Sequence, residues 1–519
     1  MFAVNHILSS LRTVFLLLVL QISAVSGQQP SERPQRIACV GNSTGDYGGF
    51  RLAPLFGEHM VFQQKKPAEI YGVANSNDTI RVTFHARTSE TTAGSDGRWK
   101  IILPPLPAGG PYPLQIRVNG ALQVDWSDIM VGEVWLCSGQ SNMEFELKSS
   151  ENGMPEAGNA SDNKLRFFNY KGFVRTNDIA FDSLSLERIN ALDYFEGSWQ
   201  TCSPETARDF SAIGYYFGRS LRWELDVPVG LVVVAVGGAP IEAFIDRKTL
   251  ELHPVLVDVF PYRSENDFIF EWVRQRTARN ISLSNNPLQR HPYDPAYIFE
   301  AGIAPLGGFP IQGVLWYQGE SNAHHPELYQ TSFTELVQSW RNFRNDPRLP
   351  FFFAQLSSID RPTWPHFRDV QRQLAEQIPH TAMVVTTDIG DSLDVHPVRK
   401  KEVGERFALQ AFDKVYGLAV KGDGPAPLKT KATSENLVIV FKSARRLRTS
   451  DGKPLRELEI TGTGAIFRPA SGVLKRNKLI INEPGRKITA VRYGWKPFSR
   501  GNLVSETGLP ASTFLINTK

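Results

Sequence analysis

Short strands separated by turns dominate the first part of the chain, between residues 47 and 127. Apolar residues there come in brief runs or alternate with polar ones, and no segment of helix length has a helical period. The expected strands lie at residues 60–62, 69–71, 80–84, 99–103 and 114–118. Turn-forming residues at 95–97 and 108–110 interrupt the series. This spacing is typical of a small β-sandwich, which we predict for residues 47–127.

Between residues 128 and 419, apolar runs alternate with amphipathic helical segments. The clearest unit is an apolar strand at 313–317, followed from Pro326 by a helix with apolar side chains on one face. Further strands are expected at residues 134–136, 231–235, 351–354 and 383–385. This alternation predicts a parallel sheet in an α/β domain. Short strands return at 437–441 and 479–481 and predict a C-terminal β domain over residues 420–519.

The first 27 residues have the pattern of a secretory signal peptide. His6 and Arg12 precede a short apolar run at 14–20, and small residues at 25–27 offer a cleavage site. The run is shorter than the roughly 20 apolar residues that cross a bilayer. We therefore expect a secreted or exported protein without a stable membrane span, an uncleaved anchor being the alternative. Residues 28–46 are polar and without periodicity, which predicts a linker.

Composition narrows the class of protein. Of the 519 residues, 41% are hydrophobic and 21% charged, as in globular proteins, which excludes a disordered chain. The formal net charge of +4 is too small for this length to indicate a nucleic-acid partner. Three cysteines are too few for a disulfide scaffold or an all-cysteine zinc site. A large enzyme or a binding protein remains.

Four loops that follow expected strands carry reactive side chains. In open parallel α/β sheets the ligand site lies beyond the carboxyl ends of the strands. The loops are residues 138–143, 236–240, 318–322 and 388–397. Together they hold a serine, two adjacent glycines, an asparagine, and a histidine near acidic residues. A serine esterase needs this set for its nucleophile, oxyanion donors and base.

The residues alone leave the nucleophile and the base open. Ser141 and Ser321 both lie in a Gly-x-Ser-Asn sequence, so spacing does not choose between them. The Gly-x-Ser-x-Gly pattern of α/β-hydrolases is absent, since Met143 replaces the second glycine. Four histidines precede proline, namely His253, His291, His325 and His396. Of these, His396 follows a carboxylate by two residues at a strand end, which favours it as the base.

A metal site is the alternative reading of the third loop. Glu320, His324 and His325 carry ligand-type side chains within six positions. Pro326 follows directly and is typical of the first turn of a helix. We therefore prefer the interpretation that these residues form a polar loop leading into a helix to the interpretation that they bind a metal. We therefore expect no metal.

At these loops the sequence resembles the sialate O-acetylesterases, a family of the SGNH/GDSL hydrolase superfamily. The resemblance is carried by residues 131–143, 237–243, 316–322, 396–397, 60–63 and 491–495. It covers nearly the whole chain after the expected signal peptide. It implies an SGNH-type three-layer α/β/α core with a parallel sheet over residues 128–419, flanked by the N-terminal β-sandwich and the C-terminal β domain.

The resemblance also implies the catalytic residues. It makes Ser141 the nucleophile, which decides between the two serines, and His396 the general base. Many enzymes of the superfamily place the triad acid three residues before the histidine, where this chain has Leu393. Asp394 is our expected acid and Asp391 the second choice, with a Ser–His dyad as a further alternative.

The remaining site residues follow from the same resemblance. The backbone amides of Gly238 and Ser141 and the side-chain amide of Asn322 are expected to stabilise the oxyanion. Gln318 and Glu320 are expected to shape the substrate pocket. The mechanism needs no metal and no organic cofactor.

The expected function is that of a serine hydrolase that cleaves carboxylic esters, removing O-acetyl groups from sialic acids through an acyl-enzyme. Its partner is then an O-acetylated sugar or glycoconjugate, with no nucleic acid involved. Acetylated xylan or another polysaccharide is an alternative substrate of the same chemistry. A catalytically inactive carbohydrate-binding protein is the alternative from a different class.

Overall fold

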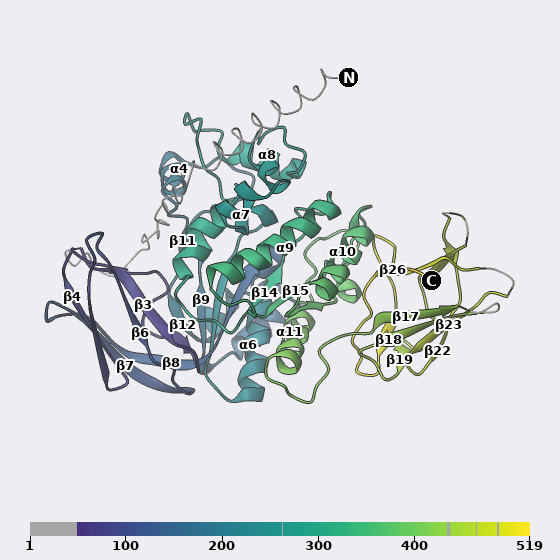
Figure 1. Ribbon diagram of the computed structural model, residues 1–519, viewed down its shortest axis with the longest axis horizontal. Coiled ribbons are helices and arrows are strands. Elements are labelled where there is room, and N and C mark those ends of the chain that lie inside the picture. The colour runs from purple at the N-terminus through teal and green to yellow at the C-terminus, as the bar shows by residue number, and fades with distance from the viewer. Residues whose placement is uncertain are drawn as a thin grey trace, which may run out of the picture. The chain divides into compact units, whose positions relative to one another are not determined.

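A parallel sheet lies in the middle of the fold and carries the four candidate loops at its carboxyl end. Our computed structural model describes residues 49–518 except 262, 433–435, 463, 465, 485 and 486. The expected signal peptide and linker lie outside the described residues. In spatial order the parallel strands are β9 (Asp162–Asn169), β13 (Val229–Ala235), β8 (Ala121–Gly139), β14 (Gly313–Tyr317), β15 (Phe351–Ala354) and β16 (Thr381–Val384) (Figure 1). The short strand β12 (Trp199–Cys202) joins β9 in antiparallel orientation, so the sheet is mixed.

Helices cover both faces of this sheet. The pair α6 (Ala212–Leu225) and α11 (Lys401–Lys414) packs below it in Figure 1, and the pair α9 (Pro326–Phe343) and α10 (Trp364–Gln377) packs above it. Strands β13, β14 and β15 are buried along their whole length. Burial on both faces explains why these strands are continuous apolar runs in the sequence. The predicted α/β class is confirmed.

Helix α9 shows how local sequence sets an element. Pro326 occupies the first turn, where its missing N–H costs nothing, and the His325 ring accepts the Leu328 N–H at 3.3 Å as an N-terminal cap. Phe333 and Trp340 lie on the face that is buried against the sheet. The predicted start of this helix is confirmed.

Strand β8 joins the N-terminal β region to the parallel sheet. Its first half pairs antiparallel with β7 (Gly109–Val118), and its second half pairs parallel with β13 and β14. The domain boundary expected between residues 127 and 128 therefore lies inside a continuous strand. One hydrophobic core runs from Phe50 to Phe412 through both regions.

The N-terminal region is built from short strands, as its pattern predicted. They are β1 (Arg51–Leu52), β2 (Val61–Gln63), β3 (Ala68–Val73), β4 (Thr79–Phe84), β5 (Arg87–Thr92) and β6 (Arg98–Leu103). Strands β1, β3 and β6 form one sheet, whereas β5, β4 and β7 continue outward from β8. Strand β5 was not expected, because its side chains are all polar and mostly exposed.

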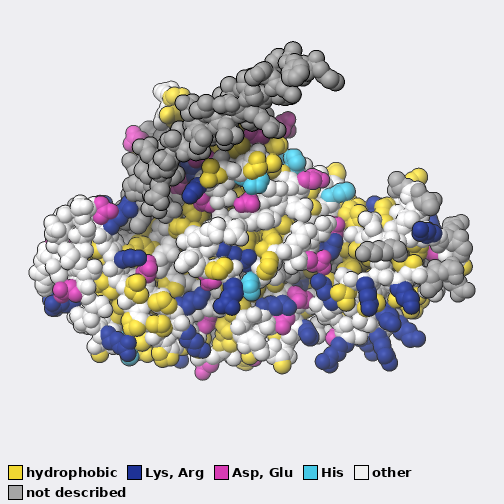
Figure 2. All heavy atoms as spheres, in the orientation of Figure 1, with side chains coloured by type: hydrophobic (Ala, Val, Ile, Leu, Met, Phe, Trp, Pro, Cys, Tyr) yellow, Lys and Arg dark blue, Asp and Glu magenta, His cyan; other side chains and the backbone are white. Residues whose placement is uncertain are grey.

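The C-terminal region has a hydrophobic core of its own, which includes Leu437, Ile439 and Phe514. Its longer strands are β17 (Ala426–Ala432), β18 (Asn436–Lys442), β20 (Leu458–Thr461), β23 (Lys478–Asn482), β24 (Ala490–Tyr493) and β26 (Phe514–Asn517). Its shorter strands are β19 (Leu447–Thr449), β21 (Arg468–Pro469), β22 (Val473–Lys475) and β25 (Leu503–Ser505). Figure 2 shows Lys and Arg side chains gathered over this region, where Lys429, Lys475 and Lys478 are exposed.

Shorter helices and two small strands complete the region around the parallel sheet. Among the described residues the helices are α2 (Ser141–Glu144), α3 (Gly153–Gly158), α4 (Ser183–Asn190), α5 (Pro204–Arg208), α7 (Arg247–Leu252) and α8 (Glu271–Asn280). The small strands β10 (Lys171–Gly172) and β11 (Phe195–Glu196) pair with each other beside them. No helix in the described part of the chain has the length and apolar character to cross a lipid bilayer.

Candidate active site

The first loop presents Ser141 at a sharp turn between β8 and α2. Gly139 has a φ of 135°, and a Cβ at this position would lie 2.1 Å from the Tyr317 carbonyl oxygen of the neighbouring strand. Glycine is therefore required for the turn. The turn places the Ser141 Oγ 2.8 Å from Nε2 of His396, although 255 positions separate the two residues.

The fourth loop holds the His396 ring beside this serine. Asn142, next to Ser141, donates a side-chain hydrogen bond to the Val395 carbonyl at 3.0 Å and so ties the two loops together. Partial burial and the nearby Lys400 ammonium lower the pKa of His396 below its ordinary value of 6.5. The imidazole is therefore neutral near pH 7 and can accept the serine proton.

Asp394 lies close to His396 but engages its backbone more closely than its ring. Its carboxylate accepts the His396 N–H at 2.8 Å and lies 3.5 Å from the ring Nδ1, beyond a good hydrogen bond. The Asp394 side chain is 63% exposed. Asp391 accepts the N–H groups of Leu393 and Asp394 at 2.8 and 3.0 Å, and so caps the turn rather than facing the ring.

The second loop brings Gly238 to the same place from the end of β13. Gly238 has a φ of 77°, and a Cβ there would lie 2.5 Å from both the Trp272 ring and the Tyr293 hydroxyl. The Tyr293 hydroxyl donates a 2.5 Å hydrogen bond to the Gly237 carbonyl. The glycine pair is thus held in one conformation by side chains from outside the parallel sheet.

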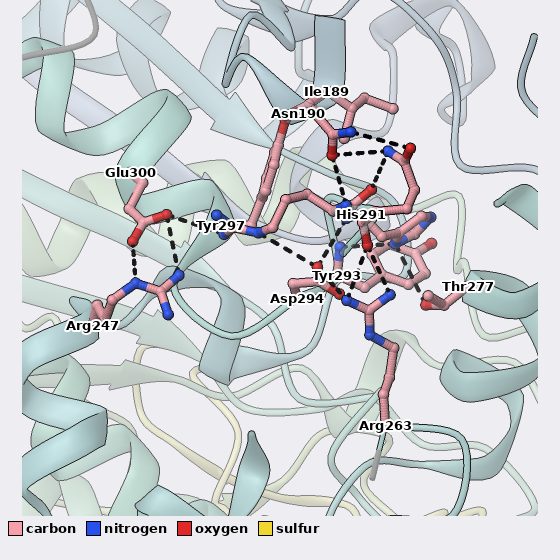
Figure 3. Close-up of polar contacts among 12 residues, drawn as sticks. Ile189, Asn190, Arg247, Arg263, Thr277, His291, Tyr293, Asp294, Tyr297 and Glu300 are labelled. Carbon is pink, nitrogen blue, oxygen red and sulfur yellow. Dashed lines mark hydrogen bonds and ion pairs between the residues drawn. The ribbon is translucent and has the colours of Figure 1, made fainter. Parts of the chain in front are cut away.

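A buried polar network fixes Tyr293 (Figure 3). The Tyr293 N–H donates to Nδ1 of His291 at 3.0 Å, so Nε2 carries the proton that reaches the Asn280 side-chain oxygen at 3.0 Å. The carboxylate of Asp294 accepts the His291 N–H at 2.9 Å and pairs with Arg263 at 2.6 Å. Burial lowers the pKa of His291 well below its ordinary value, which keeps this ring neutral.

The third loop places Ser321 in the interior. Its hydroxyl is fully buried and donates to the Gly238 carbonyl at 2.9 Å, and its N–H reaches the Gln140 side-chain oxygen at 3.4 Å. The two Gly-x-Ser-Asn sequences thus have different surroundings, and only Ser141 contacts a histidine among the described residues.

Asn322 and Gln318 lie behind the glycine loop. The side-chain oxygen of Asn322 accepts the Ile241 N–H at 2.9 Å and the Gln318 amide at 2.7 Å, while its own amide donates to Glu242 at 2.9 Å. Burial raises the pKa of Glu242 to about 7. Gln318 also donates to the Ala239 carbonyl at 3.3 Å.

Glu320 lies beside Asn142, the residue that follows Ser141. One carboxylate oxygen accepts a hydrogen bond from Asn142, whose side-chain oxygen accepts in turn from Lys400. The other carboxylate oxygen is buried and has no hydrogen-bond partner in the described part of the chain. Burial raises the pKa of Glu320 and lowers that of Lys400 to about 7.

The alternative metal ligands do not come together. The His324 ring stacks on Phe270 with centroids 4.7 Å apart, and the His325 ring caps α9 at the Leu328 N–H. Within the described residues no three His, Cys, Asp or Glu side chains form a group that could hold a metal ion. Glu320 is engaged by Asn142 instead, so the third loop enters a helix in the way that Pro326 suggests.

The other His-Pro sequences explain why this motif alone does not single out one histidine. Nδ1 of His253 accepts the N–H groups of residues 255 and 256, and Nδ1 of His291 accepts the N–H of residue 293. His325 caps a helix in a similar way. At all three positions the ring nitrogen accepts a backbone N–H within a turn, whereas the His396 ring contacts the hydroxyl of Ser141.

A cavity of about 890 Å³ opens where the loops meet. The predicted site residues that line it are Ser141, Gly238, Glu320 and His396. Gln318, Asn322 and Asp394 are not among its lining residues. The cavity is wide enough for a sugar-sized ligand, since small-molecule sites range from about 300 to 1,000 Å³.

Several residues at the site were not found from the sequence. Trp272, Tyr293 and Arg361 line the cavity from segments without a recognisable motif. Lys400 could have been suspected as a cation four residues after His396 at the start of a helix, but its burial depends on the packing of α11. The remaining three have no signal in a single sequence.

Comparison with known proteins finds a carbohydrate esterase domain and sialate O-acetylesterases among the proteins similar to this chain. A family model described as carbohydrate esterase, sialic acid-specific acetylesterase, matches residues 285–413. A sialate O-acetylesterase from Rattus norvegicus is 28% identical over 509 residues, covering 86% of this chain and 90% of the relative. The sialate O-acetylesterase from Homo sapiens is 26% identical over 495 residues, covering 86% of this chain and 88% of the relative.

A solved structure supports the same assignment. The crystal structure of a carbohydrate acetylesterase from Xanthomonas citri superposes with a TM-score of 0.74 at 29% sequence identity. The superposition covers 91% of this chain and 100% of the Xanthomonas citri chain. The resemblance inferred from the loop sequences is confirmed: the chain is similar over most of its length to sialate O-acetylesterases, and residues 285–413 match a sialic acid-specific acetylesterase domain.

Proposed function

We propose that this protein removes acetyl groups from O-acetylated sialic acids as a serine hydrolase. The observation that carries the proposal is the 2.8 Å contact between Ser141 Oγ and His396 Nε2 at the wall of the cavity. A hydroxyl in contact with a neutral imidazole is an activated nucleophile. The similarity to sialate O-acetylesterases supports O-acetylated sialic acids as the substrate class.

The reaction proceeds in two steps through an acetyl-enzyme. His396 takes the proton of the Ser141 hydroxyl, and Oγ attacks the acetyl carbonyl. The tetrahedral intermediate collapses as His396 returns the proton to the departing sugar oxygen. Water, deprotonated by the same imidazole, then attacks the acetyl group on Ser141, which releases acetate and restores the serine.

Two backbone amides are available to the oxyanion. The N–H groups of Ser141 and Gly238 have no acceptor within the described part of the chain, and both residues line the cavity. Loss of one such donor costs about 10²–10³-fold in rate. Asn322, a third expected donor, directs its amide to Glu242 behind the loop, so we assign it the positioning of this loop.

The sugar is bound by groups that already face the cavity. Glu320 forms part of the cavity wall, with its unpartnered oxygen buried behind the surface. Trp272 and Tyr293 offer apolar ring surface on the side of Gly238. Asp394 orients His396 from the solvent side, which makes the pair closer to a dyad with a peripheral acid than to a buried triad.

Acetate release tests this function. The wild-type protein and the Ser141→Ala variant are compared on 9-O-acetylated sialic acid and on acetylated xylan. We expect release from the sialic acid and loss of at least about 10³-fold in the variant. Release that is undiminished in Ser141→Ala would contradict the assignment of the nucleophile. No release from either substrate by folded wild-type protein would favour a carbohydrate-binding role.

Acetylated polysaccharide is the second candidate substrate. It is favoured by the structural match to an enzyme described only as a carbohydrate acetylesterase. Release from xylan alone would retain the mechanism and replace the substrate.

Export is part of the proposal and rests on the apolar run at residues 14–20. N-terminal sequencing of protein recovered from the medium or periplasm is expected to begin near residue 28. Recovery of the intact N-terminus in the membrane fraction would favour the uncleaved anchor.

A further inference from the structure

Three arginines line the cavity, and two of them are already engaged. Arg175 lies 3.4 Å from Glu146 and is 78% exposed. Arg276 donates to the Thr176 carbonyl at 2.9 Å and lies 3.9 Å from Asp178. Both therefore hold the rim of the cavity together.

The third arginine, Arg361, is held in place without a countercharge. Its guanidinium lies over the Trp364 ring, 5.2 Å from the centroid, and Trp364 is fixed by a 2.9 Å hydrogen bond to the Ser357 carbonyl. The loop of Arg361 is joined to the histidine loop, because the Asp360 N–H donates to the Ser392 carbonyl at 3.2 Å. No carboxylate in the described part of the chain pairs with the Arg361 side chain.

The charge of Arg361 reaches the reacting end of the cavity. It lowers the pKa of both Glu320 and His396, so its field acts where the ester is cleaved. An unpaired guanidinium on a cavity wall is a recognition group for a carboxylate, which it meets with two parallel N–H donors.

The acidic side chains of the cavity do not neutralise this cation. Glu146 pairs with Lys148 at 2.9 Å as well as with Arg175. Glu144 is half-buried and Glu320 is buried, and desolvation raises the pKa of each carboxyl, which disfavours the charged form. The charge balance on the Arg361 side of the cavity therefore favours an anionic group on the ligand.

We propose that Arg361 binds the carboxylate of an acidic sugar and so selects sialic acids over neutral acetylated sugars. The inference rests on the proposed function, because it assigns a specificity residue to the same cavity. A sialic acid has one carboxylate, ionised at neutral pH, on the same ring system that bears its acetylated hydroxyls. The carboxylate contacts Arg361 while the acetyl ester lies at Ser141.

Binding of an unreactive product tests the inference separately from catalysis. N-acetylneuraminic acid and its methyl ester, which lacks the charge, are titrated calorimetrically into wild type, Arg361→Met, Arg361→Lys and Arg175→Met. Wild type is expected to bind the acid at least about tenfold more tightly than the ester, the scale of one charge-assisted pair. Arg361→Met should remove this difference, Arg361→Lys should keep part of it, and the control Arg175→Met should keep all of it.

Three results would overturn the inference: equal binding of acid and ester by wild type, no binding of either, or an unchanged ratio in Arg361→Met. Near-UV circular dichroism shows whether each variant is folded. If Arg361→Met fails to fold, the inference is tested by Arg361→Lys, which should keep part of the preference for the acid over the ester. Failure of the proposed function is detected by a different experiment: the wild-type protein would release no acetate from acetylated sialic acid.

Discussion

The carboxylate of Asp394 accepts the His396 N–H at 2.8 Å, while the ring Nδ1 of the same histidine lies 3.5 Å from it. Asp394 therefore fixes the turn that carries the histidine and affects the ring mainly through its charge. In a triad with a buried acid bonded to the ring, loss of that bond costs about 10⁴-fold in kcat. The exposure of Asp394 predicts a smaller contribution here.

We expect Asp394→Asn to lower kcat/KM by about fivefold or less. An exposed ion pair contributes at most about 1 kcal/mol, and asparagine can still accept the backbone N–H. Because the Asp394 charge raises the pKa of His396, its removal should also move the acid limb of the pH–rate profile to lower pH. Asp391→Asn is the control, since it keeps the turn and does not touch the ring. A loss above about 10³-fold in Asp394→Asn would make this residue a full triad acid.

Lys400 is expected to set the pH range of activity. Activity should rise with pH as His396 loses its proton. The nearby charges of Lys400 and Arg361 lower the pKa of His396, whereas the charge of Asp394 raises this pKa. Lys400→Met removes a positive charge, so the acid limb should move to higher pH. Lys400→Arg should leave it near the wild-type position. The measurement is kcat/KM for 4-nitrophenyl acetate against pH, and an unmoved limb in Lys400→Met would show that this charge does not reach the base.

Tyr293 is expected to position the glycine loop. Tyr293→Phe removes the 2.5 Å hydrogen bond to the Gly237 carbonyl and should lower kcat about tenfold with little change in KM, because a lost buried hydrogen bond is worth about 1–2 kcal/mol. Tyr297→Phe is the matched control. Its hydroxyl donates to the Ile189 carbonyl at 2.7 Å in the same region (Figure 3), and Tyr297 is not among the residues that line the cavity. Equal kcat in the two variants would remove the positioning role.

The C-terminal β region is expected to depend on Arg368 of α10. This buried guanidinium donates to the carbonyl oxygens of Gly494, Lys496 and Pro497 at 3.0, 2.6 and 2.9 Å. Arg368→Met should lower the free energy of unfolding by about 2–4 kcal/mol in urea titration, since it leaves buried carbonyls unpaired. Lys442→Met breaks only the exposed 3.3 Å pair with Glu376 and should cost about 1 kcal/mol or less. Similar losses of unfolding free energy in both variants would contradict the claim that Arg368 holds the C-terminal β region to α10.

The strands and helices that the sequence predicted well are those set by local pattern. Strand β14 is a continuous apolar run and was placed at its observed limits, and α9 combines a first-turn proline with a one-sided apolar face and was placed at its observed start. Strand β9 was missed because its first three residues, Asp162, Asn163 and Lys164, are polar. Its burial at Leu165 and beyond comes from the neighbouring β13, which no local window contains.

The part of the candidate site that lies on loops directly after strands could be predicted from the sequence. Ser141, Gly238, Glu320 and His396 meet because the strands before the first three are neighbours in the sheet. The contacts of Asn142 with Lys400, 258 positions away, and the place of Arg361 on the wall depend on how α11 and the loop after β15 pack. Such relationships are set by tertiary structure alone, and a single sequence carries no trace of them.

The central claim is that Ser141, activated by His396, is the nucleophile of this cavity. A fluorophosphonate probe, which reacts with activated serines, is incubated with the wild-type, Ser141→Ala, Ser321→Ala and His396→Ala proteins, and the adducts are mapped by mass spectrometry. We predict one adduct, on Ser141, in the wild-type and Ser321→Ala proteins, and none in Ser141→Ala or His396→Ala. An adduct on Ser321, or labelling that persists in folded Ser141→Ala, would contradict the account.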